Sequence, residues 1–267
     1  MTRLWDRARA RIPLSAKIHH RAFYNWLTGE PELRILKHVC DPSRAAVDVG
    51  ANVGIYTYFL RRHSRRCYAV EPNPALVDVL KRSFGHSVEI LPLALSDQTA
   101  SVQLRLPTID GTADHGRATI EDANRLDRHD RTLIDVRTTR LDDLDLGAVG
   151  FIKIDVEGHE MAVLNGGRVL LARDRPVLLI ESEERHKPGA IGELFAFLGE
   201  RGYRGFFRLE GRLCPVDTFK TSVHQRPENV GDYGVIPDRT YINNFLFLPN
   251  RPDRAHLMSR LGLVEAP

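Results

Sequence analysis

The stretch that decides the fold is Ala45–Thr57, which reads AAVDVGANVGIYT. Its first five residues form the short apolar run of a buried strand, and a helical pattern follows the last glycine. The turn between them holds Gly50, Asn52 and Gly54, with Asp48 just before it. In a parallel sheet such a turn lies at the carboxyl end of its strand, where these sheets bind ligands. We therefore expect a ligand site at this turn.

Short β-branched runs alternate with helical patterns after residue 45, which is typical of βαβ units and a parallel sheet covered on both faces. We expect strands at 45–49, 67–70, 88–95, 149–154, 177–180 and 245–248. Helices are expected at 55–62, 74–84, 159–172 and 190–201. The pattern predicts one α/β domain with a doubly wound sheet over 45–250, a helical extension over 1–44 and a tail over 251–267.

Two stretches interrupt this alternation. Residues 101–106 alternate as a strand, and residues 108–131 are polar, with Gly111, Gly116 and clustered charges. A long irregular segment in a compact domain is usually functional or disordered, so we expect 108–131 to be a lid. The Pro- and Gly-rich stretch 218–240 is expected to be a loop near the site.

Composition excludes several classes of protein. The 267 residues are 42% hydrophobic and 27% charged, which is ordinary globular composition. The net charge is only +3, so we do not expect nucleic acid to be a partner. The three cysteines are far apart, which suggests neither a disulfide framework nor a zinc site.

No apolar run has the roughly 18 residues of a membrane span, and the N-terminus lacks the apolar stretch of a signal peptide. We expect a soluble, cytoplasmic protein without a transmembrane segment. The N-terminus is basic and contains Leu4, Trp5, Ile12, Leu14 and Ile18. A helix packed on the domain is the favoured interpretation of it, and a helix on a membrane surface is the alternative.

The glycine turn does not have the dinucleotide-binding pattern G-x-G-x-x-G, because Asn52 takes the place of the middle glycine. Asp48 can accept a hydrogen bond from an ammonium group, which suits a cationic cofactor better than a pyrophosphate. Glu71 follows the second strand about 20 residues later, the spacing of an acid that binds ribose hydroxyls. The alternatives are a tight turn without a ligand, and a Glu71 that only caps the next helix.

Five segments carry a resemblance to a known family: VDVGANVGIYT (47–57), AVEPNP (69–74), ALSD (94–97), FIKIDVEGHE (151–160) and NFLFLP (244–249). Over residues 31–249 the chain resembles the FkbM family of S-adenosylmethionine-dependent methyltransferases. The resemblance implies a seven-stranded Rossmann-like methyltransferase sheet and S-adenosylmethionine as the methyl donor. It also implies O-methylation of a hydroxyl on a sugar, glycolipid or polyketide-type small molecule.

The resemblance further assigns parts of the cofactor to individual residues. The methionine part lies along Asp48, Gly50, Asn52 and Gly54, and the ribose lies on Glu71. The adenine lies against two short turns, which consist of Pro72, Asn73, Leu95, Ser96 and Asp97.

The fourth strand of this sheet ends in a cluster of ionisable residues, from which we expect the catalytic groups Asp155, Glu157 and His159. Glu181 joins them from the end of the fifth strand. An imidazole commonly accepts a proton near neutral pH, so His159 is the expected general base. Two alternatives stay open: a divalent metal ion held by Asp155, Glu181 and Glu183, and pure positioning of the acceptor.

Simpler structural roles also fit parts of this cluster. Lys153 and Asp155 share one strand face and can form a buried ion pair. His159 and Glu160 can belong to a solvated first helical turn. The competing functions are a nicotinamide-dependent oxidoreductase and a cofactor-binding module without catalysis. The oligomeric state stays open.

Overall fold

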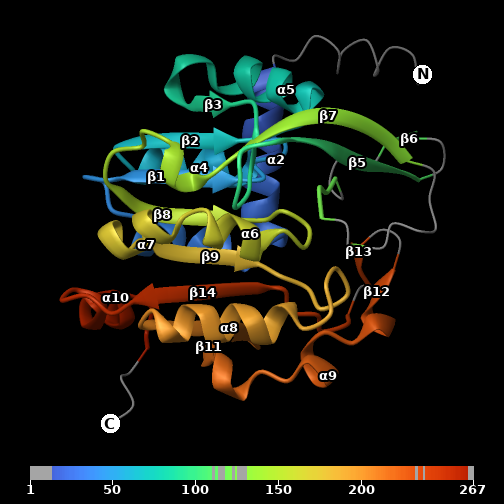
Figure 1. Cartoon of the computed structure of the whole chain (residues 1–267). Helices are drawn as coiled ribbons and strands as arrows, with labels where there is room; N and C mark the ends of the chain where they lie inside the picture. Colours follow the sequence, from blue (N-terminus) through green and yellow to red (C-terminus); the bar gives the residue numbers. More distant parts are fainter. Residues whose placement is uncertain are drawn as a thin grey trace.

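The computed structural model describes residues 14–109, 112–113, 118–121, 124, 131–231, 234–236 and 238–263. Within them, an eight-stranded sheet has the order β11-β10-β14-β9-β8-β1-β2-β3 (Figure 1). The parallel strands are β1 (Ala45–Val49), β2 (Arg66–Val70), β3 (Glu89–Leu91), β8 (Val149–Ile154) and β9 (Val177–Glu181). The antiparallel strands are β14 (Asn244–Pro249), β10 (Tyr203–Leu209) and β11 (Arg212–Pro215).

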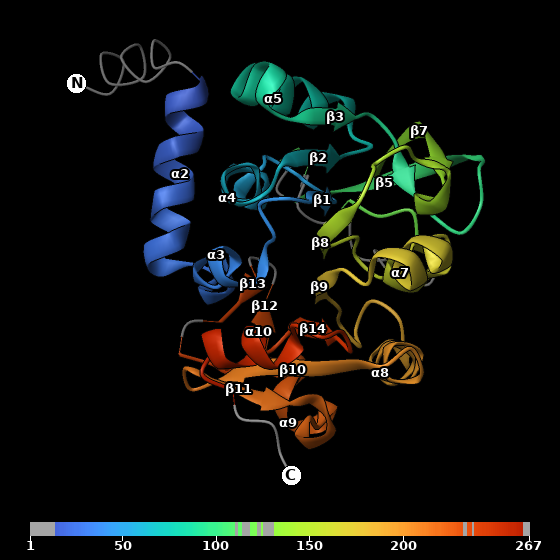
Figure 2. The ribbon, with the colours of Figure 1, turned by 90° about the vertical axis from the view of Figure 1, so that its left-hand side faces the viewer.

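Helices cover both faces of this sheet (Figures 1 and 2). One face packs on α6 (Glu160–Asn165), α7 (Arg168–Asp174) and α8 (Ala190–Glu200). The other face packs on α2 (Leu14–Thr28), α3 (Leu36–Val39), α4 (Ile55–His63), α5 (Pro74–Phe84) and α10 (Arg254–Arg260). Successive residues of β1 enter the two cores in turn, Val47 one and Ala46 the other. The expected doubly wound α/β fold is therefore confirmed.

The main sheet has one strand more than the seven expected. The additional strand is β11, which forms a hairpin with β10 at the sheet edge. The hairpin turns at Glu210 and Gly211, whose φ angles are 48° and 81°. Two consecutive residues with positive φ make the kind of tight turn that matches the twist of paired strands.

A second sheet lies beside the first, in the order β4-β7-β5-β6. It consists of β4 (Ala94–Leu95), β5 (Ser101–Ile109), β6 (Thr112–Ala113) and β7 (Arg131–Thr139). The expected strand over 88–95 is thus wrong in its extent, because it divides into β3 and β4 around Pro92. Proline has no N–H to donate to a sheet, and β4 pairs with β7 in the second sheet instead.

The single helix expected over 159–172 is also divided, into α6 and α7. Gly166 and Gly167 lie between them, against the β4 turn and a short helix after β7. A Cβ atom on Gly166 would lie 2.0 Å from the carbonyl oxygen of Ser96. The break therefore allows the chain to approach this turn closely.

The remaining elements are short. They are η1 (Pro31–Arg34), η2 (Gly85–Ser87), η4 (Leu141–Asp143), η5 (Val216–Thr218), α9 (Thr221–His224), η6 (Pro227–Asn229), β12 (Val230–Gly231) and β13 (Gly234–Val235). In the described part of the chain, no helix has the length and apolar character needed to cross a membrane.

Candidate active site

The turn after β1 has the backbone that its glycines predict. Gly50 and Gly54 have φ angles of 79° and 87°, and Asn52 also has a positive φ of 52°. A Cβ atom on Gly50 would lie 1.8 Å from the carbonyl oxygen of Asp155. Only glycine can occupy this position without displacing the end of β8, so the turn and Asp155 are held against each other.

Glu71 is fixed beside this turn by two backbone hydrogen bonds. Its Oε2 accepts from the N–H of Asn52 at 2.8 Å and its Oε1 accepts from the N–H of Asn73 at 3.0 Å. The side chain is only 5% exposed. Burial raises the pKa of Glu71 to about 7, although the two N–H donors oppose this. Each carboxylate oxygen keeps a lone pair for a ligand hydroxyl.

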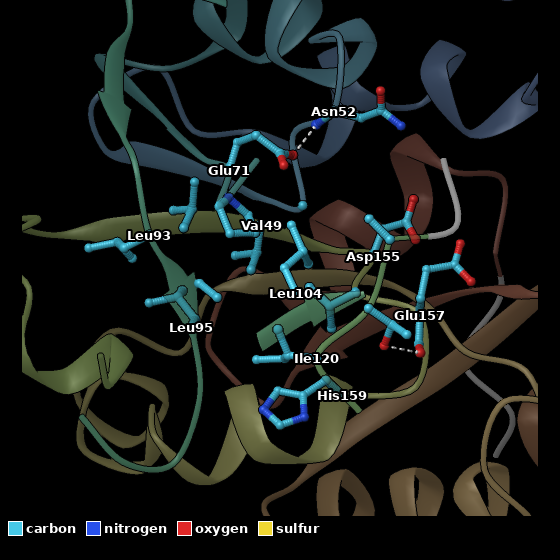
Figure 3. Close-up of a pocket in the computed structure, with 17 residues that line it drawn as sticks. Val49, Asn52, Glu71, Leu93, Leu95, Leu104, Ile120, Asp155, Glu157 and His159 are labelled. Atoms are coloured by element: carbon cyan, nitrogen blue, oxygen red, sulfur yellow. Dashed lines mark hydrogen bonds between the residues drawn. The ribbon is translucent and has the colours of Figure 1, made fainter. Parts of the chain in front are cut away.

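A cleft of about 600 Å³ opens beside Glu71 (Figure 3). Asn52, Asp155 and Glu157 give it polar side chains, and Gly50 and Pro72 also line it. The rest of its wall is largely apolar and comes from β4, β5 and residues 118–120: Leu93, Ala94, Leu95, Leu104, Ala118 and Ile120. The cleft therefore offers hydrogen-bonding groups at one end and a flat-sided apolar space at the other, as a nucleoside requires.

Besides Asp48, which lines a neighbouring cavity, four of the expected cofactor residues do not line this cleft. Gly54 packs against Phe84, and Asn73 caps α5 by accepting a hydrogen bond from the N–H of Ala75. Ser96 and Asp97 lie behind the apolar wall, where the Ser96 hydroxyl contacts the Asp97 carboxylate at 3.2 Å. In the structure these residues support the site rather than form its surface.

A second cavity of about 600 Å³ lies on the other side of the glycine turn. It shares Gly50, Asn52 and Asp155 with the cleft. Its further lining includes Asp48, Tyr56 and Lys153 from the sheet and α4, and Arg21, Asn25 and Glu30 from α2 and the turn after it. The sequence alone does not indicate which residues of α2 line a cavity, because this helix carries no motif that relates it to the sheet.

Lys153 is the cationic centre of a group of carboxylates. It is 1% exposed, and its Nζ lies 3.8 Å from both Asp155 Oδ2 and Glu181 Oε2. Burial alone would lower the pKa of Lys153, but these two carboxylates outweigh it and the pKa is raised. The buried pair that the sequence offered as a simpler explanation is thus present, with Glu181 as an additional partner.

Among the described residues near Lys153, the carboxyl groups outnumber the cations. Arg21 is the other cation that lines the second cavity, whereas the acids are Glu30, Asp48, Asp155 and Glu181. Burial raises the pKa of Asp48 to about 6, although Thr57 donates a hydrogen bond to it and Lys153 is near. Burial and Asp155 likewise raise the pKa of Glu181. In both groups burial is the largest cause of the raised pKa. The excess of carboxyl groups in the lining, rather than these shifts, makes this part of the site suitable for a cationic ligand, such as a sulfonium that also carries an ammonium group.

His159 lies near Ile120 in the apolar part of the cleft (Figure 3), whereas Lys153 does not line this cleft. Its Nε2 is 2.9 Å from Ser96 Oγ, and its Nδ1 is 3.1 Å from Glu121 Oε2. Both ring nitrogens therefore have partners, and neither partner lines the cleft itself. This arrangement orients the ring and joins β4, α6 and the segment around residue 121.

Glu157 and Glu183 form contacts of their own at the ends of β8 and β9. Glu157 Oε2 is 3.1 Å from His186 Nε2, and burial and Asp155 raise the pKa of Glu157. Glu183 accepts hydrogen bonds from Arg185 and from Tyr241. No group of three His, Cys, Asp or Glu side chains within the described ranges converges on a possible metal position. The metal alternative therefore has no support from the geometry.

The described part of the expected lid closes on the cleft. Thr119 Oγ1 and Asn124 Nδ2 both donate to the carbonyl oxygen of Glu157, at 3.0 and 2.8 Å. Thr119 also pairs with Arg105 of β5 through two backbone hydrogen bonds. The two hinge candidates, Gly111 and Gly116, lie outside the described residues.

The sequence matches one family model, that of the Methyltransferase FkbM domain, over residues 48–204, more than half of the chain. A search of curated proteins gives no match. Among solved structures, a methyltransferase FkbM from Methylobacillus flagellatus KT is 18% identical, with a TM-score of 0.49. The match covers 88% of this chain and 55% of that chain, so the present chain spans about half the length of that protein.

Two further solved structures are similar at lower identity. An rRNA methylase from Streptococcus thermophilus is 13% identical, with a TM-score of 0.43 and coverage of 81% of this chain and 92% of that chain. A precorrin-6y C5,15-methyltransferase from Geobacter metallireducens is 13% identical, with a TM-score of 0.43 and coverage of 84% and 90%.

Proposed function

The chain belongs to the FkbM family of methyltransferases, and from this premise we propose that it transfers a methyl group from S-adenosylmethionine to a hydroxyl of a small molecule. A sugar, a glycolipid or a polyketide-type compound is the proposed acceptor class. One observation carries the donor site: the Glu71 carboxylate is fixed by the N–H groups of Asn52 and Asn73 beside a glycine turn. A carboxylate held in this way can bind both hydroxyls of a ribose.

The cavities also offer suitable surroundings for the adenine and the methionine part of S-adenosylmethionine. The adenine fits the apolar end of the cleft, near Leu95 and Ile120. The methionine part fits along Gly50 and Asn52 toward Asp48, where the cleft and the second cavity meet. S-Adenosylmethionine supplies an electrophilic methyl group on a positively charged sulfur, and the surplus of carboxylates at this point compensates that charge.

Asp155 is the proposed acceptor of the hydroxyl proton, in place of the His159 expected from the sequence. Asp155 lines both cavities, whereas His159 lines only the cleft, with each ring nitrogen already paired. Lys153 holds the Asp155 carboxylate at the junction. We propose that His159 instead orients the wall on which the adenine rests.

Two alternatives remain to be separated by experiment. Membership of a methyltransferase family argues against the nicotinamide-dependent oxidoreductase, but not against a module that binds the cofactor without catalysis. Some of the similar structures are RNA methyltransferases, so RNA belongs in the assay as a competing acceptor. The net charge of +3 favours a small molecule over RNA.

The test is a transfer assay with donor labelled at the methyl group. Sugars, glycolipids, polyhydroxylated polyketides and RNA are offered separately to the wild type and to Glu71→Ala and Glu89→Ala. Glu89 is an exposed carboxylate on β3 and serves as the matched control. We expect label on a hydroxyl compound, lost in Glu71→Ala and kept in Glu89→Ala. Transfer to RNA alone, or tight donor binding without any transfer, would contradict the proposal.

A further inference from the structure

The helix α2 presents bulky apolar side chains away from the protein. Among its described side chains, those of residues 18–28, Ile18 and Ala22 are the buried ones. Four residues of its last turns are exposed, namely Phe23 (60%), Tyr24 (59%), Leu27 (48%) and Trp26 (38%). Phe23 stacks on Trp26, with ring centroids 6.2 Å apart. Figure 2 shows this helix standing along the edge of the molecule. We call these four side chains the aromatic face.

A basic groove begins where the aromatic face ends. It has an open volume of about 1790 Å³, and Trp26 belongs to its lining. Its floor comes from η1, α3, α4, the β10–β11 hairpin and the end of α10. Its lining includes eight basic residues and no acidic one: Arg34, Lys37, His38, Arg62, His63, Arg208, Arg212 and Arg260.

In the part of the chain that the structure describes, the positive charge of this groove is only partly neutralised, through the electrostatic interaction of Arg208 with the buried Glu32. Across the residues that the structure describes, none of the eight forms an ion pair with a carboxylate. Arg34 donates to the carbonyl oxygens of Trp26 and Leu27, and Arg260 donates to that of Lys37. These bonds orient the guanidinium groups and leave their charge uncompensated.

The pKa values of the two histidines in the groove, His38 and His63, also indicate a positive electrostatic potential there. Burial and the neighbouring Lys37 and Arg260 lower the pKa of His38. Burial and the neighbouring Arg62 and Lys37 lower the pKa of His63. A bound anion would relieve this crowding of cations.

We infer that the aromatic face and the basic groove together form a docking surface for a membrane that contains anionic lipids. Aromatic and aliphatic side chains on one helix face enter the headgroup region of a bilayer, and each nearby Lys or Arg adds attraction to anionic headgroups. The basic side chains that line the groove are suitable partners for the phosphate groups of lipids. This surface includes none of the residues 1–13.

Charge complementarity favours an anionic membrane over a second copy of the chain as the partner of this surface. In a two-fold pair the same patch meets itself, so two aromatic faces in contact would bring two basic grooves close together. An anionic bilayer is complementary to both parts at once. The surface also continues toward the site, because Arg21 and Asn25 of α2 line the second cavity. A hydroxyl carried on a lipid would thus be delivered beside Asp155, a consequence that rests on the proposed function.

Vesicle co-sedimentation of the full chain tests the docking surface without any catalysis. One probe is vesicles of phosphatidylcholine alone, which carry no net charge. The other is vesicles that also contain about 30% phosphatidylglycerol, which gives them a negative surface charge. We expect binding to the anionic vesicles only, and a loss of most of it between 0.1 and about 1 M salt. The variants are Lys37→Glu/Arg212→Glu for the groove and Phe23→Ser/Leu27→Ser for the aromatic face.

The controls match the number and kind of substitutions in the surface variants. Arg137→Glu/Arg226→Glu reverses two exposed cations that lie outside the groove, and Leu133→Ser/Val169→Ser removes two exposed apolar side chains outside the aromatic face. Each surface variant should lower vesicle affinity by about tenfold or more, and each control by less than about twofold. Light scattering and circular dichroism establish that all variants stay folded and in one oligomeric state.

Several results would overturn the inference. Equal binding to both vesicle types, or no binding at low salt, would exclude recognition of anionic lipid. Equal losses of vesicle affinity in the groove variant and its charge control would show that binding depends only on the net charge of the protein. A dimer that Phe23→Ser/Leu27→Ser converts to a monomer, without vesicle binding by the wild type, would assign the aromatic face to a second copy. Binding of RNA instead of vesicles through the groove cations would assign it to nucleic acid.

Discussion

Asp155 and His159 are only four residues apart, yet their side chains have different surroundings. Asp155 lies between two cavities beside Lys153, whereas His159 is paired with Ser96 and Glu121 at the apolar wall. We expect Asp155→Asn to lower kcat by roughly 10²–10⁴-fold and to leave the Kd for S-adenosylhomocysteine nearly unchanged. His159→Ala should instead raise this Kd and lower kcat by less than about tenfold.

Steady-state kinetics and equilibrium binding of both variants decide between these roles. The opposite pattern, with kcat lost in His159→Ala and kept in Asp155→Asn, would identify His159 as the general base. Inhibition by a chelator would revive the metal alternative, for which Glu181→Gln should then be as damaging as Asp155→Asn.

Gly50 provides a structural prediction at the same scale. Gly50→Ala places a Cβ atom 1.8 Å from the Asp155 carbonyl oxygen, at a φ of 79°. We expect a loss of at least about 2 kcal/mol in the free energy of unfolding, measured with urea. The control is Gly192→Ala in α8, where no atom lies near the added Cβ, and it should be neutral or stabilising by up to about 1 kcal/mol. Equal stability of the two variants would show that the turn can relax.

Among the elements, the segment around residues 118–124 is the one that a ligand should affect most. Thr119 and Asn124 attach it to the Glu157 carbonyl, and Thr119 and Ile120 line the cleft. We expect S-adenosylhomocysteine to slow proteolysis within residues 108–131, because a ligand in the cleft adds contacts to this segment. Cleavage at equal rates with and without the ligand would count against a lid.

The sequence predicted the elements wherever local signals and packing agree. Pro74 after Asn73 defines the start of α5, and the run 45–49 becomes β1 without change. Division of the strand over 88–95 and of the helix over 159–172 depends on contacts with distant segments, namely β7 and Ser96. Pro92 and the pair Gly166–Gly167 mark both divisions in the sequence, but the sequence does not show which distant segments the chain contacts there.

The candidate site follows the same rule. Glu71 and the glycine turn could be placed from spacing alone, because the carboxyl ends of adjacent parallel strands meet at one edge. The hydrogen-bond partners of the His159 ring could not be predicted from spacing, because Glu121 comes from an irregular segment. The role of α2 in the second cavity also depends on tertiary packing.

For the whole molecule, buried carboxyl groups predict how stability depends on pH. The pKa values of Asp48, Glu71 and Glu160 are raised by burial to about 6, 7 and 7. A carboxyl pKa that is higher in the folded state contributes stability at low pH, and this contribution is lost as pH rises through the folded value. We therefore expect the free energy of unfolding to fall by roughly 2–5 kcal/mol between pH 5 and pH 8.

Urea unfolding at several pH values, with Glu71→Gln and Glu89→Gln, measures this slope. Glu71→Gln should flatten it and Glu89→Gln should not. The comparison is best made above pH 6.5, because the lowered pKa values of His38 and His63 act in the opposite direction below it. A stability that rises from pH 6.5 to pH 8 would contradict the assigned protonation of these carboxyl groups.

The donor site at Glu71 is the central claim, and calorimetric titration with S-adenosylhomocysteine tests it most directly. Wild type and Glu89→Ala should bind the ligand alike and should not bind NAD. Glu71→Ala should bind S-adenosylhomocysteine more weakly by roughly 1–3 kcal/mol, because the ribose hydroxyls lose their buried acceptor. Unchanged affinity in a folded Glu71→Ala protein, or tighter binding of NAD than of S-adenosylhomocysteine by the wild type, would contradict the account.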